Sequence, residues 1–248
     1  MLGRHHLALS VTTMVALSAP FLHSREEFLL TVIVGTTIGS LIPDVDSPDA
    51  KIFHKNIVKG NNKTGKLVNL SIGLLVPVFG YTTKYLIYKP VVLLLNIITF
   101  GRNFKNTHRG FTHSIIGLIA ISTVTATYIK LFLNWLQIIP NNHFKIFMAS
   151  YVMGALLHVV QDSCTKSGIA WNAPFSKTKV KGKLVTGKDN HKPEILQAIL
   201  ALLLIGTTYS IYVNKIPAEK VIPYSVTALT ITWLLFIKVV AGAKIVRK

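Results

Sequence analysis

Residues 108–139 read HRGFTHSIIGLIAISTVTATYIKLFLNWLQII, a short polar motif followed at once by a long apolar run. The run, residues 115–139, carries a single charged side chain, Lys130. A helix needs about 20 apolar residues to cross the hydrocarbon core of a bilayer, and this run is long enough. Because backbone polar groups inside a bilayer must be satisfied within the segment itself, the run predicts a transmembrane α-helix that begins just after the polar motif.

Apolar runs of this kind recur along the whole chain of 248 residues. Half of the residues are hydrophobic, only 15% are charged, and the mean hydropathy is +0.49. A soluble domain of this length could bury a core, but it would not normally show so many long apolar runs. The candidate runs are residues 7–22, 28–42, 67–81, 85–100, 115–139, 144–160, 195–213 and 221–240. We therefore expect an all-α fold, a multi-pass transmembrane helical bundle of about six to eight hydrophobic helices.

We expect residues 1–248 to form a single integral membrane domain. Its predicted parts are a metal-site core over residues 1–175, a basic loop over residues 176–194 and C-terminal helices over residues 195–248. Residues 67–100 contain Pro77, Lys84 and Pro90, so they are compatible either with two spans joined by a hairpin or with a re-entrant pair. The alternating lysines of residues 177–183 fit either a small exposed hairpin that turns at Gly182 or a solvated loop.

The charge distribution predicts the orientation of the bundle. The chain has 27 lysine and arginine residues, nine acidic residues and a formal net charge of +18. If it crosses the membrane at each run, most of the basic residues lie on the face that holds both termini. Lysine and arginine favour the cytoplasmic side, so we expect a bacterial-type inner or plasma membrane protein with its termini in the cytoplasm. Such a face would also attract anionic membrane lipids.

Other classes of partner and site are disfavoured by the sequence. No helix-turn-helix, zinc finger or aromatic platform accompanies the lysines, so no nucleic-acid partner is expected. The single cysteine, Cys164, excludes an internal disulfide and a thiolate cluster. The oligomeric state is left open.

Three polar motifs interrupt the apolar pattern, at residues 43–46 (PDVD), 108–113 (HRGFTH) and 158–162 (HVVQD). In the expected topology all three lie at the cytoplasmic face, together with His6 at the start of the first run. Ionisable side chains in an apolar setting usually mark function, and imidazole plus carboxylate is a ligand set for a divalent metal. The candidate ligands are His6, Asp44, Asp46, His108, His113, His158 and Asp162. Seven ligands exceed the need of one zinc, so we expect one or two ions or some residues that only orient the ligands.

The first two motifs each have a plainer alternative. Pro43 tends to end a helix, and Asp44 and Asp46 could then bend toward one cation or simply form a turn. In residues 108–114, Thr112 or Ser114 is a plausible N-cap of the following helix.

Arg109 and the third motif point toward anion and metal chemistry. Arg109 could hold a phosphate with two nitrogens. His158 and Asp162 are four residues apart, so they share one face of a helix. Asp162 could therefore bind the same ion as His158, orient a histidine as an outer partner, or pair with His158 to join two helices.

These motifs resemble the YdjM-like family of predicted membrane-bound metal-dependent hydrolases. The matching stretches are residues 4–7 (RHHL), 41–46 (LIPDVD), 108–114 (HRGFTHS) and 154–162 (GALLHVVQD), followed by Thr165, Gly168 and Pro174. The resemblance covers roughly residues 1–175 and aligns the family's N-terminal histidine with His6 rather than His5. Lys166 follows Thr165 where the family often has proline, which changes the turn expected there. The resemblance implies a multi-pass protein with a metal-dependent hydrolase signature, distantly similar to zinc-dependent phospholipase C.

The expected function is therefore a membrane-bound, metal-dependent hydrolase of a phospholipid or another phosphoester. Zinc is the expected metal, with manganese and iron as alternatives, and a metal-activated water would be the nucleophile. Asp44 or Asp46 would act as general base, and Arg109 would offset charge on the phosphoryl oxygens. The alternative is a non-catalytic metal- or lipid-binding or transport protein, although no acidic residue lies in the middle of a predicted span.

Overall fold

The structure, a computed structural model, describes residues 3–22, 25–47, 49–54, 75–98, 109–139 and 141–247. In this part of the chain the α-helices are α1 (Gly3–Leu22), α2 (Leu29–Leu41), α4 (Leu75–Thr82), α5 (Lys89–Ile98), α6 (Ile115–Trp135), α7 (Asn142–Ser163), α8 (His191–Tyr212) and α9 (Ala218–Leu235). Short 3₁₀ segments are η1 (Glu26–Phe28), η2 (Ile42–Asp46), η3 (Lys51–Phe53) and η5 (Phe111–His113), and π-helical segments are η4 (Thr83–Tyr88) and η6 (Phe236–Val240). Two short strands, β1 (Lys179–Lys181) and β2 (Lys244–Val246), complete the described elements. The prediction of an all-α bundle is confirmed.

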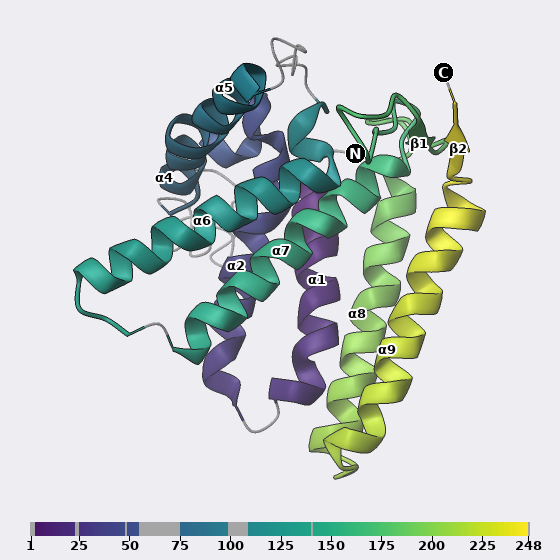
Figure 1. Cartoon of the computed structure of the whole chain (residues 1–248). Helices are drawn as coiled ribbons and strands as arrows, with labels where there is room; N and C mark the ends of the chain where they lie inside the picture. The colour runs from purple at the N-terminus through teal and green to yellow at the C-terminus, as the bar shows by residue number, and fades with distance from the viewer. Residues whose placement is uncertain are drawn as a thin grey trace.

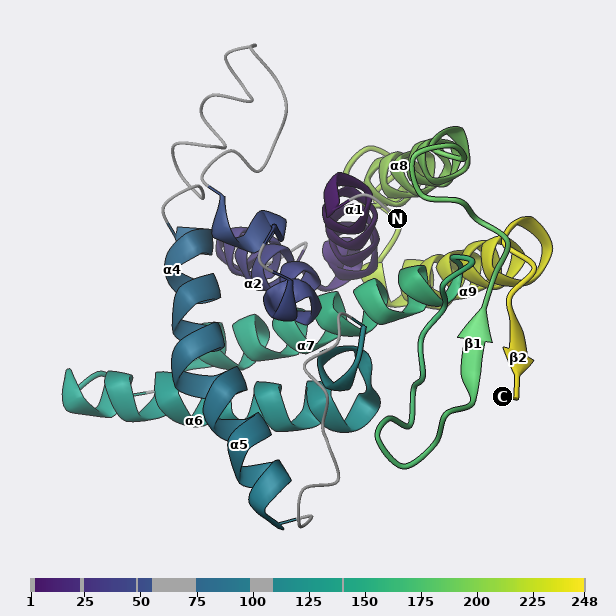
Figure 2. The ribbon, with the colours of Figure 1, turned by 90° about the horizontal axis from the view of Figure 1, so that it is seen from above.

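Five of the described helical stretches are long and apolar enough to cross a membrane. They are Glu26–Asp46, Ile115–Trp135, Asn142–Ser163, His191–Tyr212 and Ala218–Val240. Helix α1 is of similar length but more polar, with Ser10 and Thr13 buried inside the bundle. It contacts α2, α7, α8 and α9, so it is the central helix (Figure 2).

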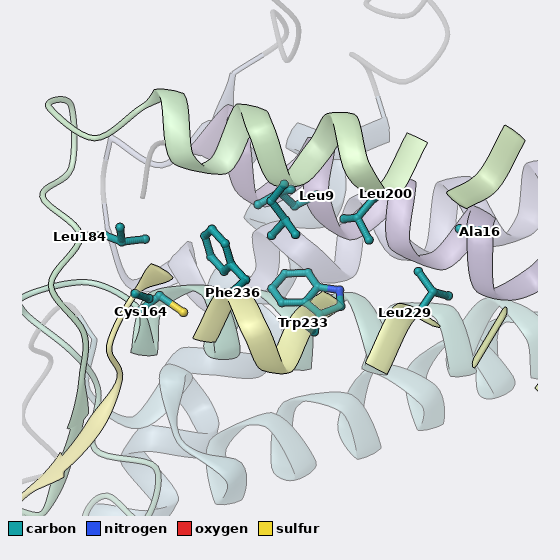
Figure 3. Close-up of a cluster of buried hydrophobic side chains, with 10 residues drawn as sticks. Leu9, Ala16, Cys164, Leu184, Leu200, Leu229, Trp233 and Phe236 are labelled. Carbon is teal, nitrogen blue, oxygen red and sulfur yellow. The ribbon is translucent and has the colours of Figure 1, made fainter. Parts of the chain in front are cut away.

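One side of α1 is covered by α8 and α9, the C-terminal helices. Leu9 and Ala16 of α1 meet Leu200 of α8 and Leu229 of α9 in one buried apolar cluster (Figure 3). Trp233 belongs to the same cluster, and its indole N–H donates to the Thr13 hydroxyl at 3.2 Å. The Thr13 hydroxyl, which donates to the Leu9 carbonyl of its own helix at 2.6 Å, thus also accepts a hydrogen bond from α9.

Helices α2 and α7 pack at backbone contact, which fixes the position of the third polar motif. A Cβ atom at Gly39 would lie 2.0 Å from the carbonyl oxygen of Tyr151, and one at Gly154 would lie 2.6 Å from that of Thr36. Neither position can hold a side chain without moving a backbone. The close approach brings the end of α7 against the end of α2.

The ends of these helices follow local sequence rules. Helix α2 ends at Leu41, and Pro43 lies at the start of the 3₁₀ turn η2, as its position in the sequence suggested. Ser114 caps α6 by accepting a hydrogen bond from the Gly117 N–H at 3.0 Å. Asn141 caps α7 through the N–H groups of the second and third residues that follow it.

Residues 75–98 form one helical rod that passes from α4 through η4 into α5 without a break. This differs from both arrangements expected for residues 67–100, of which 67–74 and 99–100 lie outside the described residues. Pro90 lacks the N–H of a helical hydrogen bond, and the wider π-helical turn just before it accommodates that loss. The prolines therefore do not break the helix.

The basic loop after α7 is held by the C-terminus of the chain. Strand β1 pairs antiparallel with β2, with Lys179 opposite Val246 and Lys181 opposite Lys244. Of the two arrangements that fitted residues 177–183, the hairpin is wrong: a strand forms, but it pairs with β2, more than sixty residues away, and Val180 also bridges to Ile169. Gly182 instead donates to the Thr165 carbonyl at 3.0 Å, where the loop covers the end of α7.

Candidate metal centre

Four segments that are distant in the sequence meet at the end of the bundle near the N-terminus (Figure 1). They are the start of α1, the turn η2 after α2, the turn η5 before α6, and the end of α7. The side chains they bring together are His6 from α1, Asp44 and Asp46 from η2, Arg109 and His113 from the η5 segment, and His158 and Asp162 from α7. The structure thus brings these four segments together, as the topology predicted.

The three histidines are almost completely buried. His113 and His158 have no exposed surface, and His6 is 2% exposed. Asp162 is equally enclosed, whereas the side chain of Asp44 is 20% exposed. Among the described residues, the cluster is therefore reached from outside on the side of Asp44.

Two overlapping sets of ligand atoms could hold a metal ion. His6, His158 and Asp162 form one set, and Asp44, His113 and His158 form the other; within each set the atoms lie within 4.8 Å of one another. His158 belongs to both sets, so the two sets describe one site or two adjoining ones. The rings of His6 and His158 stack, with 3.9 Å between their centroids, so the two side chains lie against each other in the cluster.

His158 gives the clearest sign that the cluster suits a cation. Its Nδ1 lies 2.6 Å from the carbonyl oxygen of Ser40, and a carbonyl can only accept, so Nδ1 carries the proton. In the neutral ring Nε2 is then a lone pair, and it faces the carboxylates of Asp44 at 3.6 Å and Asp162 at 3.8 Å. Among the described residues, Nε2 has no hydrogen-bond partner. A buried lone pair facing two carboxylates is unfavourable unless a cation lies between them.

His113 is oriented in a comparable way by a hydroxyl. The Thr112 hydroxyl donates to Asp46 Oδ2 at 2.9 Å, so its oxygen accepts from His113 Nδ1 at 3.0 Å. His113 Nε2 then faces Asp44 Oδ1 at 3.4 Å and Asp162 Oδ2 at 3.6 Å. A carboxylate behind a ligating histidine is a common outer partner in metal sites. Asp46 is placed to be such a partner of His113, through the Thr112 hydroxyl.

Arg109 connects the two aspartate-bearing segments. Its backbone N–H donates to Asp46 Oδ2 at 3.2 Å, from a backbone with a positive φ of 65°. Its guanidinium faces both oxygens of Asp162, with Nε and Nη2 each at 2.9 Å. Nη1 bonds to the hydroxyls of Thr165 and Ser167. The side chain, which the sequence suggested as a phosphate clamp, is engaged with a carboxylate of the cluster.

The charge balance of the cluster matches a divalent cation. Three carboxylates are gathered around one guanidinium, so with neutral imidazoles the cluster keeps a net negative charge. The donors are imidazole nitrogens and carboxylate oxygens, which suit zinc, manganese or iron. The described residues therefore fit a divalent metal by chemistry, by charge and by the orientation of His158.

One of the predicted ligands, His108, lies outside the described residues. His6 rather than His5 faces the cluster, because His5 points to Glu194, with 3.7 Å between its Nε2 and the glutamate Oε1.

Several partners of the site were not expected from the sequence. The Ser40 carbonyl and Ser167 carry no sequence signal, because their roles depend on which segments meet in the fold. The N–H of Lys166 donates to the Leu184 carbonyl at 3.0 Å, a bond that proline could not make. The basic loop is thus fastened just behind Arg109.

Comparison with known proteins yields one match. The profile of the family described as YdjM inner membrane protein matches residues 1–241 of this chain. No curated protein and no solved structure matches.

Proposed function

This chain belongs to the YdjM inner membrane protein family, and we propose that it is a membrane-bound, metal-dependent hydrolase of a phospholipid or another phosphoester. The observation that carries the proposal is the Nε2 atom of His158, which is aimed at two carboxylates while its Nδ1 proton is held by Ser40. Such a buried arrangement is costly without a cation. In a membrane protein, groups of this kind usually mark function.

The ligands proposed for the metal are His6, Asp44, His113, His158 and Asp162. A bound divalent cation would supply Lewis acidity and lower the pKa of a water molecule. Asp44 is the carboxylate with the largest exposure in the cluster, so it is the group placed to take a proton from an incoming water. Arg109, whose side chain is 17% exposed, would offset charge that develops on a phosphoryl oxygen. Asp46 would position His113 through Thr112.

We place the site and both termini on the cytoplasmic side. The site end of the bundle carries the β1–β2 ribbon, on which Lys181 and Lys244 stand opposite each other, and basic residues favour the cytoplasmic face. A Thr186→Cys variant should react with a membrane-impermeant maleimide in inside-out vesicles but not in intact cells. The reverse pattern would refute the orientation.

The function is tested with the full-length protein in detergent or nanodiscs. Bound metal is measured by elemental analysis, and hydrolysis is screened on phospholipids and soluble phosphodiesters with wild type, Asp44→Asn and Asp49→Asn. Asp49 is an exposed aspartate close in sequence, so Asp49→Asn is the matched control. We expect turnover in wild type and in the control, and a loss of at least about 100-fold in Asp44→Asn. Equal turnover in all three would remove Asp44 from the mechanism.

A second function is favoured by one observation, the near-complete burial of the three histidines. A structural metal site is closed, with protein ligands at every position, whereas a catalytic one keeps an open position. In that case the protein would be a non-catalytic metal- or lipid-binding membrane protein. Tightly bound metal without exchangeable water and without turnover on any substrate in the screen would select this second function.

A further inference from the structure

The helical rod of residues 75–98 runs across the bundle rather than along it. It is foreshortened in Figure 1 and seen along its length in Figure 2, whereas α1 and α8 are seen along their length in Figure 1 and foreshortened in Figure 2. It lies at the same end of the bundle as the candidate metal centre. The rod therefore crosses the direction of α1 and α8, as α6 also does in Figure 2.

The inner face of the rod is packed on the segments that carry the site. Tyr88 is buried with Val45, which lies between the two aspartates of η2, and with Phe111 of η5. Ile87 is buried in the cluster that contains Ile52 of η3. A Cβ atom at Gly80 would lie 2.7 Å from the Ile52 carbonyl, so the rod approaches η3 at backbone contact.

The outer face of the rod carries large apolar side chains along its whole length. Its large side chains are between 51% and 64% exposed: Val78, Tyr81, Tyr85, Leu86, Leu93, Leu94, Ile97 and Ile98. An exposed apolar surface of this extent is unfavourable in water and marks an interaction site. Basic side chains flank the aromatic ones, with Lys84 Nζ 4.6 Å from the centroid of Phe53 and Lys89 Nζ 4.4 Å from that of Tyr85.

We infer that residues 75–98 form an interfacial helix, which lies in the plane of the leaflet at the site end with Val78, Leu93 and Ile97 in the lipid. The bundle is integral to a membrane, so lipid surrounds it at the level where its spans end. A helix that runs across α1 and α8 and exposes large apolar side chains, with tyrosine and lysine among them, fits the boundary between headgroups and acyl chains.

The test measures depth with spin labels on the full-length protein in phosphatidylethanolamine–phosphatidylglycerol vesicles. Labels are placed on Val78→Cys, Leu93→Cys and Ile97→Cys, with Ile205→Cys on α8 as the lipid control and Thr186→Cys as the water control. Cys164 is fully buried, so labelling is directed to the new cysteine, and a Cys164→Ala background checks this. Accessibility to oxygen and to a water-soluble nickel chelate gives the depth of each label.

We expect the three rod labels to share one shallow depth between those of the two controls. A steady increase in depth from residue 78 to residue 97, which would reach roughly 30 Å at 1.5 Å per residue, would show a span and overturn the inference. Nickel accessibility equal to that of the water control, or shielding from both reagents by a second copy or another protein, would also overturn it. Because the readout does not depend on metal or turnover, either result leaves the proposed hydrolase to its own test.

Discussion

At the scale of single residues, the orientation of His158 determines what the cluster can bind. Its Nδ1 proton is committed to the Ser40 carbonyl, so only Nε2 is available for a metal. Asp44 and Asp162 approach that atom from two different segments. The two carboxylates and the imidazole thus depend on one another, and removing one changes the charge balance of the whole site.

Replacing His158 with alanine should abolish metal binding. The ring belongs to both sets of ligand atoms, so its loss affects every arrangement of ions that the cluster could hold. Metal content per protein, measured after dialysis against trace zinc, should fall to background. His143→Ala is the matched control, because His143 lies on the same helix but contacts Thr31, far from the site. Full metal content in the His158 variant would exclude the proposed centre.

Thr112 should increase the affinity for metal, although it is not one of the proposed ligands. Thr112→Val removes the hydroxyl that connects Asp46 with His113, and the loss of such an outer partner typically weakens binding by about 10–100-fold. Thr112→Ser retains the hydroxyl and should restore most of the affinity. The dissociation constant of zinc, measured by competition with a chromophoric chelator, checks both variants. Equal affinity in Thr112→Val and wild type would contradict the role.

The sequence could predict which residues gather at the site, but only part of what each one does. His6, Asp44, His113 and Asp162 were found because all lie at span ends on one face. The role of Thr112 was not, since local rules suit either Thr112 or Ser114 as the cap of α6, and the structure uses Ser114. Arg109 faces Asp162 across a sequence separation of 53 residues, which no local pattern encodes.

At the scale of elements, the backbone contact between α2 and α7 holds His158 against Ser40. Gly39 and Gly154 make this contact possible, because a side chain at either position would collide with a backbone atom. The packing of the two helices and the geometry of the site are therefore one feature.

Gly39→Ala should destabilise the protein and weaken metal binding together. Its new Cβ atom would lie 2.0 Å from the Tyr151 carbonyl, and overpacking of this kind typically costs about 1–3 kcal/mol. Gly206→Ala on α8 is the control, because nothing lies within 4 Å of its Cβ position and alanine is the better helix former, by up to about 1 kcal/mol. Thermal unfolding in one detergent compares them. A Gly39 variant as stable as wild type would show that the two helices separate easily.

The elements that were predicted well are those with strong local signals. Long apolar runs indicated α6 to α9, and Pro43 indicated the end of α2. The course of residues 75–98 could not be predicted, because the sequence pattern of an apolar helix of that length is compatible both with crossing the membrane and with lying in its surface. The partner of β1 was missed for a similar reason: period-two alternation identifies a strand but not what it pairs with.

At the scale of the whole molecule, the candidate site is part of what holds the bundle together. Its ligands come from α1, α7 and the turns before α6 and after α2, so a bound ion would connect segments that cover most of the N-terminal two thirds of the chain. Repulsion among the three carboxylates opposes that assembly when the ion is removed.

Removing the metal should therefore lower the melting temperature of the wild-type protein. An ion at 100 times its dissociation constant stabilises the folded state by about 2.7 kcal/mol, which chelation would abolish. The shift is measured by thermal unfolding with and without a chelator, and added zinc should reverse it. The His158→Ala variant, which binds no metal, should show no shift. An equal shift in both would mean that the chelator acts elsewhere.

The central position of α1 has a consequence for the order in which the protein is made. This helix is made before α8 and α9, yet Thr13 accepts a hydrogen bond from Trp233 of α9, and Leu9 is covered by residues of α8 and α9. During synthesis the side of α1 that carries Leu9 and Thr13 therefore stays uncovered until α8 and α9 have been made. Helices α8 and α9 provide none of the proposed ligands, but they cover one side of the helix that carries His6. A nascent chain that stops before α8 would thus contain every candidate ligand but would lack the two helices that cover α1.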